Sequence, residues 1–287
     1  MITDPKSVTI VTHADAPEGV ADDHVLAAVL NDHEVNHRFA VWSDRTIDWS
    51  ATTVTIVRSS WDYHLDISRW SNWIDQVETK TQLINSAALL RWNGAKTYLL
   101  QLADTGIDVV STQKVDGSTG LGDLCDSQGW EDVVVKPTVG ASSFGVKRFS
   151  GDEIAKQGVR HASALAGRGD VIVQPFQAIL ESEQERSLVY ITGRFGHAFQ
   201  KPSFHSDVSM EALTSHVPSS AELALAEATL AALPEPPVFA RIDMIPGSSG
   251  PLLMEVELIE PELALHMSQN TAMQLAEVLS SFVASSP

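Results

Sequence analysis

Short apolar runs alternate with one amphipathic stretch at the start of the chain. Residues 7–12, 39–42 and 54–57 are rich in β-branched and aromatic side chains, which favour strands. Residues 21–32 instead repeat apolar side chains at helical spacing, which predicts a helix that begins near Asp22. Strands that alternate with helices are typical of a parallel sheet with crossover connections. We therefore predict a small parallel α/β domain in this part of the chain.

Further elements follow from the same patterns. Residues 67–77 carry a stripe of tryptophan and aliphatic side chains, which indicates a core helix rather than a ligand site. A helix that opens at Arg91 and ends at Gly106 would place Lys96 in its first turn, where a cation is unfavourable unless an anion lies nearby. A surface lysine is the alternative. Other predicted elements are strands at 133–135, 171–176 and 187–191 and helices at 221–233 and 271–283. Residues 204–220 show no clear periodicity.

Acidic side chains occupy regular positions in two predicted strands, residues 239–244 and 252–257, which a turn-rich segment joins. As antiparallel neighbours these strands place Asp243 opposite Glu255, and the strand period of two puts Glu255 and Glu257 on one face. Carboxylates this close repel one another unless a cation is present. A set of oxygen ligands without histidine or cysteine suits Mg²⁺. We predict a magnesium site there; an alternating strand with solvated glutamates is the alternative.

A loop of small residues follows a run of three valines. Residues 133–135 predict a buried strand, and Lys136 comes directly after it, ahead of a loop bracketed by glycines at 140 and 145. Backbone N–H groups and the hydroxyls of Ser142 and Ser143 can converge on a phosphate in such a loop, with the lysine as a fixed positive charge. An ordinary hairpin turn is the alternative.

Three better-known motifs do not fit. A Walker A loop has its lysine after the second glycine, where this chain has Val146. A hydrolase nucleophile elbow needs Gly-x-Ser-x-Gly, and Phe144 stands at the position of the second glycine. His-Glu-x-x-His occurs at 33–37, but Asn31 and Asp32 end the predicted helix before it. A zinc protease needs both histidines on one helix face, so we interpret this match as a loop.

Composition limits the class of protein. The chain has 287 residues, of which 44% are hydrophobic, so it can bury a large core. Its formal net charge of −18 disfavours partners such as nucleic acid and anionic membranes. The single cysteine, Cys125, excludes an internal disulfide, and no apolar run reaches the ~20 residues of a membrane span. Residues 1–15 lack the pattern of a signal peptide, so we expect a cytoplasmic protein.

The loop at 136–146 reads Lys-Pro-x-x-x-(small)-Ser-Ser-x-Gly-Val and resembles that of the ATP-grasp ligases, the superfamily of D-alanine–D-alanine ligase and glutathione synthetase. Its first glycine stands one position early. These ligases also carry Arg-x-Asp on one strand and Glu-x-Asn, then a proline, on the next. Residues 241–243 and 255–261 are similar, with Glu257 where asparagine is usual. Because glutamate keeps a metal oxygen but adds charge, metal number or affinity can differ.

Three segments, 58–63, 91–96 and 255–261, look most like the branch that contains the D-cycloserine synthetase type, close to glutathione synthetase. The resemblance implies an α/β (α+β) fold, in which a parallel N-terminal α/β domain precedes two α+β subdomains that clasp ATP. We place the N-terminal, substrate-side domain at residues 1–92. A central lid subdomain at 93–173 carries the loop, and the catalytic subdomain follows at 174–287.

The resemblance also implies roles for individual side chains. The expected ATP-binding residues are Lys96, Lys136, Ser142, Ser143, Gln174, Phe176 and Glu185. Arg241 and Lys136 are the expected catalytic residues. Asp243, Glu255 and Glu257 are expected to bind Mg²⁺, as one or two ions, with Mn²⁺ as an alternative. The expected substrate contacts are Arg58, Ser59, Trp61, Asp62, Tyr63 and Lys201. The segment at 58–63 also follows a predicted parallel strand at the end where such sheets bind ligands, although a structural turn with an aromatic plug is the alternative.

These features predict an ATP-dependent ligase that activates an amino-acid-type carboxylate as an acyl phosphate for attack by an amine-type nitrogen. In the D-cycloserine type, one substrate supplies both groups and the product is a ring. The expected partner is a small amino-acid-like molecule, without nucleic acid or membrane, and a homodimer is compatible with the sequence. A nucleotide-binding sensor or assembly subunit that has lost the chemistry is the alternative.

Overall fold

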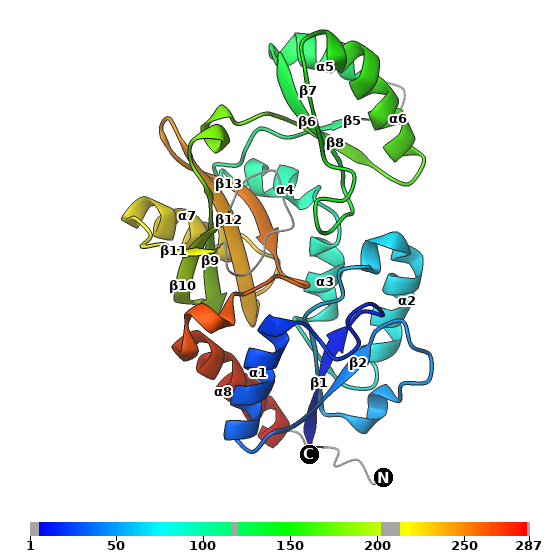
Figure 1. The fold of residues 1–287 in the computed structure, drawn as a ribbon, viewed down its shortest axis with the longest axis vertical. Helices are drawn as coiled ribbons and strands as arrows, with labels where there is room; N and C mark the ends of the chain where they lie inside the picture. The colour runs from blue at the N-terminus through cyan, green and yellow to red at the C-terminus, as the bar shows by residue number, and fades with distance from the viewer. Residues whose placement is uncertain (1–5, 116–119, 202–212, 286–287) are drawn as a thin grey trace.

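Three β-sheets organise the computed structural model, which describes residues 6–115, 120–201 and 213–285 (Figure 1). Part of the polar stretch predicted at 204–220, residues 204–212, lies outside the described residues. Within the described ranges, no helix combines the length and the apolar character needed to cross a membrane. We call the sheets the front, second and third sheet, in chain order.

The front sheet is parallel, as the sequence predicted, and its strand order is β2-β1-β3-β4. Its strands are β1 (Ser7–Thr12), β2 (Asn36–Val41), β3 (Val54–Val57) and β4 (Gln82–Ile84), and its helices are α1 (Ala21–Asp32), α2 (Ile67–Val77) and α3 (Ala87–Asn93). The tryptophan stripe of α2 is core: Trp70 and Trp73 are buried, with ring centroids 4.6 Å apart. His37 lies on β2 rather than on a helix with His33, so the zinc-protease alternative is excluded.

One predicted helix begins in the wrong place. Arg91 does not open a helix but lies in the last turn of α3, and the next helix, α4 (Tyr98–Asp104), starts seven residues later. Lys96 therefore lies in the turn between α3 and α4 and not in the first turn of a helix. The helix-dipole argument for an anion near Lys96 fails, and the position of its side chain must be judged from its contacts.

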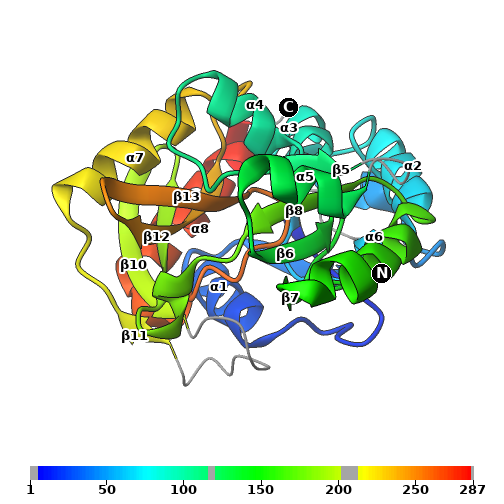
Figure 2. The same cartoon turned by 90° about the horizontal axis from the view of Figure 1, so that it is seen from above.

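The second sheet is antiparallel, with strand order β5-β8-β6-β7. It contains β5 (Gln113–Val115), β6 (Asp132–Pro137), β7 (Lys147–Ser150) and β8 (Val171–Pro175), and α5 (Leu121–Gln128) and α6 (Val159–Ala166) accompany it (Figure 2). Val133, Val135 and Val173 share one hydrophobic cluster with both helices. Because side chains alternate along a strand, Lys136 and Gln174 lie on the opposite face.

The third sheet is antiparallel, with strand order β11-β10-β9-β12-β13. Its strands are β9 (Glu185–Ile191), β10 (Arg194–Lys201), β11 (Thr214–Ser215), β12 (Phe239–Gly247) and β13 (Gly250–Glu257). In the chain, α7 (Ser220–Ala231) comes between β11 and β12, and α8 (Gln269–Ser285) follows β13. Leu188, Ala240 and Ile242 pack with α7 and α4, whereas Val189 and Phe239 pack with α8. Alternate positions therefore face opposite sides of the sheet.

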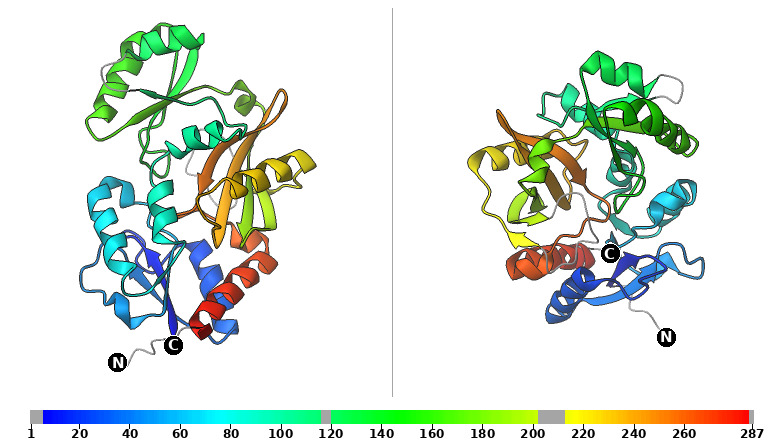
Figure 3. Two further views of the ribbon diagram at one scale, coloured as in Figure 1. Left: turned by 180° about the vertical axis from the view of Figure 1, so that it is seen from behind. Right: turned by 45° about the horizontal axis from the view of Figure 1, so that its top comes forward.

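Helix α8, near the C-terminus, packs against both the front part of the chain and the third sheet. It contacts α1, β1 and β3 of the front part and β9 and β10 of the third sheet, and Figure 3 shows it beside α1. The two parts thus share one hydrophobic cluster. The domain boundaries predicted after residues 92 and 173 fall inside α3 and β8, and the division into three units stays a prediction.

Candidate active site

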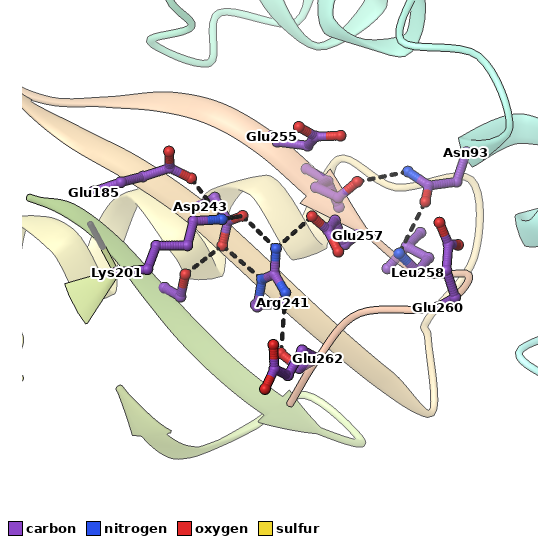
Figure 4. Close-up of polar contacts among 12 residues, drawn as sticks. Asn93, Glu185, Lys201, Arg241, Asp243, Glu255, Glu257, Leu258, Glu260 and Glu262 are labelled. Atoms are coloured by element: carbon purple, nitrogen blue, oxygen red, sulfur yellow. Dashed lines mark hydrogen bonds and ion pairs between the residues drawn. The ribbon is translucent and has the colours of Figure 1, made fainter. Parts of the chain in front are cut away.

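Arg241 on β12 is the centre of a buried charge network on the third sheet (Figure 4). Its Nε donates to Asp243 Oδ1 at 2.9 Å and one terminal nitrogen donates to Asp243 Oδ2 at 2.8 Å. The same nitrogen forms an ion pair with Glu257, and the other donates to the carbonyl oxygen of Glu262 at 3.0 Å. The register of β12 and β13 explains the pairing, because Arg241 lies opposite Glu257 and Asp243 lies opposite Glu255, as predicted.

Asp243 is fully buried and carries its charge because cations and donors surround it. Lys201 Nζ donates to Oδ2 at 2.6 Å, and Ser187 Oγ donates to Oδ1 at 2.7 Å. Burial alone would raise the pKa of Asp243, but Arg241 and Lys201 hold that pKa below its usual value. Lys201 also pairs with Glu185 at 2.8 Å, so β9 and β10 contribute to the same network.

Two lysines from separate segments lie near Glu255. Lys96, in the turn before α4, forms an ion pair with Glu255, and its backbone N–H donates to Thr138 O at 2.7 Å. Lys136, on β6, is 7% exposed; burial lowers its pKa to about 8, although the charge of Glu255 opposes this shift. The structure therefore brings the predicted pair of lysines to one place, between the second sheet and β13.

Asn93 and Tyr98, which the sequence did not identify as site residues, hold the backbone of β13. Asn93 Nδ2 donates to Val256 O at 2.8 Å, and Leu258 N donates to Asn93 Oδ1 at 2.8 Å. Tyr98 Oη donates to Val256 O at 2.9 Å and accepts from Val256 N at 3.1 Å. These bonds fix the peptide groups on both sides of Glu257.

We expect the Asn93→Leu variant to lose about 1–3 kcal/mol of unfolding free energy, because it leaves the buried N–H of Leu258 without its partner and removes one of the two donors to the Val256 carbonyl oxygen. Urea denaturation followed by tryptophan fluorescence measures this loss. Asn72→Leu, at an exposed position of α2, is the matched control and should stay within about 0.5 kcal/mol of the parent. An equal effect of the two substitutions would contradict the role of Asn93.

The three predicted metal ligands share one face of neighbouring strands, but they do not converge in this arrangement. Glu255 is paired with Lys96, while Asp243 and Glu257 are paired with Arg241. Among the described residues, no group of three or more His, Cys, Asp or Glu side chains lies close enough together to hold a metal ion. The donors are all carboxylate oxygens, which fit a hard cation such as Mg²⁺. To bind Mg²⁺ together, these three side chains would have to turn away from their cationic partners.

The glycine–serine loop, residues 140–145, connects β6 and β7 as a hairpin. Ser142 and Ser143 are exposed and have φ angles of 49° and 57°, which non-glycine residues seldom adopt and which cluster at ligand-binding segments. The ring of Phe144 lies 4.8 Å from that of His64, between centroids. The loop therefore contacts the front part of the chain directly after the 58–63 segment.

The expected adenine-side residues have protein partners. Gln174 is buried and donates from Nε2 to Thr112 Oγ1 at 2.8 Å. The guanidinium carbon of Arg148 lies 3.4 Å from the centroid of the Phe176 ring. Their roles in ATP binding, like those of Ser142 and Ser143, stay predictions.

Arg58 occupies the interior of the front part, at 2% exposure. It pairs with Asp22 at 2.8 Å and with Asp23 at 3.5 Å. Asp22 in turn accepts hydrogen bonds from the backbone of Leu263 at 2.9 Å and Leu265 at 2.6 Å. The Arg58–Asp22 pair thus fastens the segment after β13 to the front sheet.

The rest of the 58–63 segment is also anchored. Ser59 and Tyr63 are buried, and Asp62 Oδ1 accepts from Trp42 Nε1 at 2.6 Å. Trp61 Nε1 donates to the carbonyl oxygen of Glu260 at 3.1 Å. This is the packing that the aromatic-plug alternative describes, and a substrate contact by these residues stays a prediction.

Known proteins resemble this chain in sequence and in fold. A family model for the N-terminal domain of the D-cycloserine synthetase DcsG matches residues 8–85. The cycloserine biosynthesis protein DcsG of Streptomyces lavendulae is 32% identical over 261 residues, which cover 83% of this chain and 86% of that protein. The crystal structure of D-cycloserine synthetase DcsG has a TM-score of 0.88 and 27% identity, over 96% of this chain and 99% of the other. An ATP-grasp RimK domain protein from Sphaerobacter thermophilus has a TM-score of 0.71 and 17% identity, over 96% and 98%.

Proposed function

This chain belongs to the D-cycloserine synthetase family of ATP-grasp ligases, and from that premise we propose that it joins a carboxylate and an amine-type nitrogen through an acyl phosphate. The γ-phosphoryl group of ATP passes to the substrate carboxylate and ADP leaves. The nitrogen then attacks the acyl carbon, loses a proton and displaces inorganic phosphate. We further propose that one substrate supplies both groups, so that the carbon–nitrogen bond closes a ring.

The observation that carries this proposal is the convergence of cationic side chains from separate segments. Lys96 pairs with Glu255 and Lys136 lies near enough to feel its charge, while Lys201 and Arg241 both pair with Asp243, on the strand opposite. Phosphoryl transfer depends on positioned positive charge where negative charge moves, rather than on covalent chemistry by the protein.

Each side chain has a role in this proposal. Lys96 and Lys136 bind the phosphates of ATP, and Arg241 stabilises the acyl phosphate and the tetrahedral species that follows it. Bound Mg²⁺ supplies further neutralisation of phosphate charge, with Asp243, Glu255 and Glu257 as its ligands. The proposed ribose and adenine contacts are Glu185, Gln174 and Phe176. The glycine–serine loop covers the phosphates and excludes water, which would otherwise hydrolyse the acyl phosphate.

The test combines nucleotide binding with turnover. Thermal melting with ATP, ADP or GTP, each with and without Mg²⁺, should show a rise in melting temperature that requires both ATP and Mg²⁺. ADP release is then measured with the D and L forms of alanine, serine and 2,3-diaminopropionate. Amino-acid-dependent ADP release is the expected result. Binding of ATP without turnover would favour the sensor alternative, and no melting shift with any nucleotide would contradict the proposal.

A further inference from the structure

Glu260 is a carboxylate at the candidate active site that the proposed reaction does not use. It lies three residues beyond the end of β13, where its carbonyl oxygen accepts the indole N–H of Trp61. Its side chain lies near enough to Lys96 and Glu257 for their charges to shift its pKa, and Figure 4 shows it next to the charged network. Glu260 therefore stands where the third sheet meets the 58–63 segment of the front part.

The carboxylate of Glu260 differs from those of Asp243, Glu255 and Glu257 in having no cationic partner. Asp243 and Glu257 pair with Arg241, and Glu255 pairs with Lys96. Within the described part of the chain, no hydrogen bond or ion pair reaches the side chain of Glu260. Burial, with added repulsion from Glu257, raises its pKa to about 8. A partly buried carboxylate without a partner is unfavourable, so at neutral pH this side chain holds its proton. A cationic group of a ligand would lower the pKa again, displace the proton and be stabilised by the ionised carboxylate.

The surroundings of Glu260 select the kind of cation. Trp61 donates to the backbone carbonyl oxygen of Glu260, and the pKa of Tyr63 is raised first by burial and then by the nearby charge of Glu260. Aromatic rings beside a carboxylate favour an organic ammonium group, which can contact both. A hard metal ion prefers several oxygen ligands, and the nearest carboxylates are already paired.

We propose that Glu260 binds the ammonium group of the substrate and thereby restricts the enzyme to substrates with a free amino group. The inference deepens the proposed function and rests on it: the substrate carboxylate is activated near Arg241 while its ammonium group contacts Glu260. The competing role is that Glu260 only balances the charge of Lys96. In that case the residue would affect ATP binding rather than substrate choice.

The test compares ligands that differ in one group. D-Serine and D-glycerate carry an ammonium and a hydroxyl at the same carbon, as do D-alanine and D-lactate. Isothermal titration without ATP measures binding of each to the parent protein, and turnover is not needed for this readout. The parent should bind at least one of the amino acids roughly 10–100-fold more tightly than its hydroxy acid, as expected for a hydrogen bond between charged groups.

The Glu260→Gln variant should lose that preference through weaker binding of the amino acid, while the affinity for the hydroxy acid changes less than about twofold. Glu277→Gln, at an exposed position of α8, is the matched control and should keep the preference. An unchanged preference in Glu260→Gln, or a parent that binds both ligands equally, would overturn the inference. If Glu260→Gln bound ATP more weakly but kept the preference for the amino acid, Glu260 would act by balancing the charge of Lys96, and the inference would be wrong. Absence of ADP release in the parent is a separate result, which contradicts the proposed function alone.

Discussion

Lys136→Ala is expected to lower amino-acid-dependent ADP release by at least about 100-fold, the effect of removing one group that stabilises transition-state charge. The amine is buried at the end of β6, and burial has already lowered its pKa to about 8. Such a cation is poorly solvated by water, so the negative charge of a bound triphosphate would interact with it strongly. The same charge would keep Lys136 protonated at neutral pH.

The control for this substitution is Lys114→Ala. Lys114 belongs to the same sheet, on β5, but it is about half exposed and pairs with Asp170 at 2.7 Å. Initial rates of ADP release, measured at saturating Mg²⁺ and across ATP concentrations, separate a loss of ATP affinity from a loss of turnover. If the activity of Lys136→Ala stayed within about threefold of that of Lys114→Ala, the proposed role of Lys136 at the phosphates would be wrong. The loop that follows it would then be interpreted as an ordinary hairpin turn.

The strands of the site could be predicted from sequence because their signals are local. The alternation around Asp243 and Glu255 fixed both the faces and the register of β12 and β13, and the valine run placed Lys136 at the end of β6. These predictions use the strand period of two and the positions of turn residues. Both signals can be read within one short segment of chain.

The helix boundary near Arg91 could not be predicted, because its cause lies far away in the sequence. Helix α3 ends at Asn93, whose side chain bonds to the backbone of Val256 and Leu258, more than 160 residues further on. Helical propensity through this segment is overridden by that tertiary contact. The pairing of Glu255 with Lys96 was missed for the same reason.

Arg58→Met is expected to lower the free energy of unfolding by about 3–5 kcal/mol, the usual cost of removing one member of a buried ion pair. The substitution leaves Asp22 as a buried carboxylate that accepts hydrogen bonds from the N–H groups of Leu263 and Leu265 but has lost its cation. Typical domains have about 5–15 kcal/mol of stability, so the loss is large enough to follow by urea denaturation. Arg91→Met is the control, because its pairs with Asp75 and Glu78 are exposed and should contribute less than about 1 kcal/mol.

This experiment also decides between the two interpretations of the 58–63 segment. A substrate-binding arginine that lacks a structural role would leave stability unchanged in Arg58→Met and would weaken substrate binding. If Arg58 is structural, Arg58→Met would lower the free energy of unfolding, and the protein that remains folded would bind substrate almost as the parent does. Because Arg58 is 2% exposed and bonded to Asp22, we expect the second result. The substrate would then meet the front part of the chain through Trp61, whose indole contacts the backbone of Glu260, rather than through Arg58.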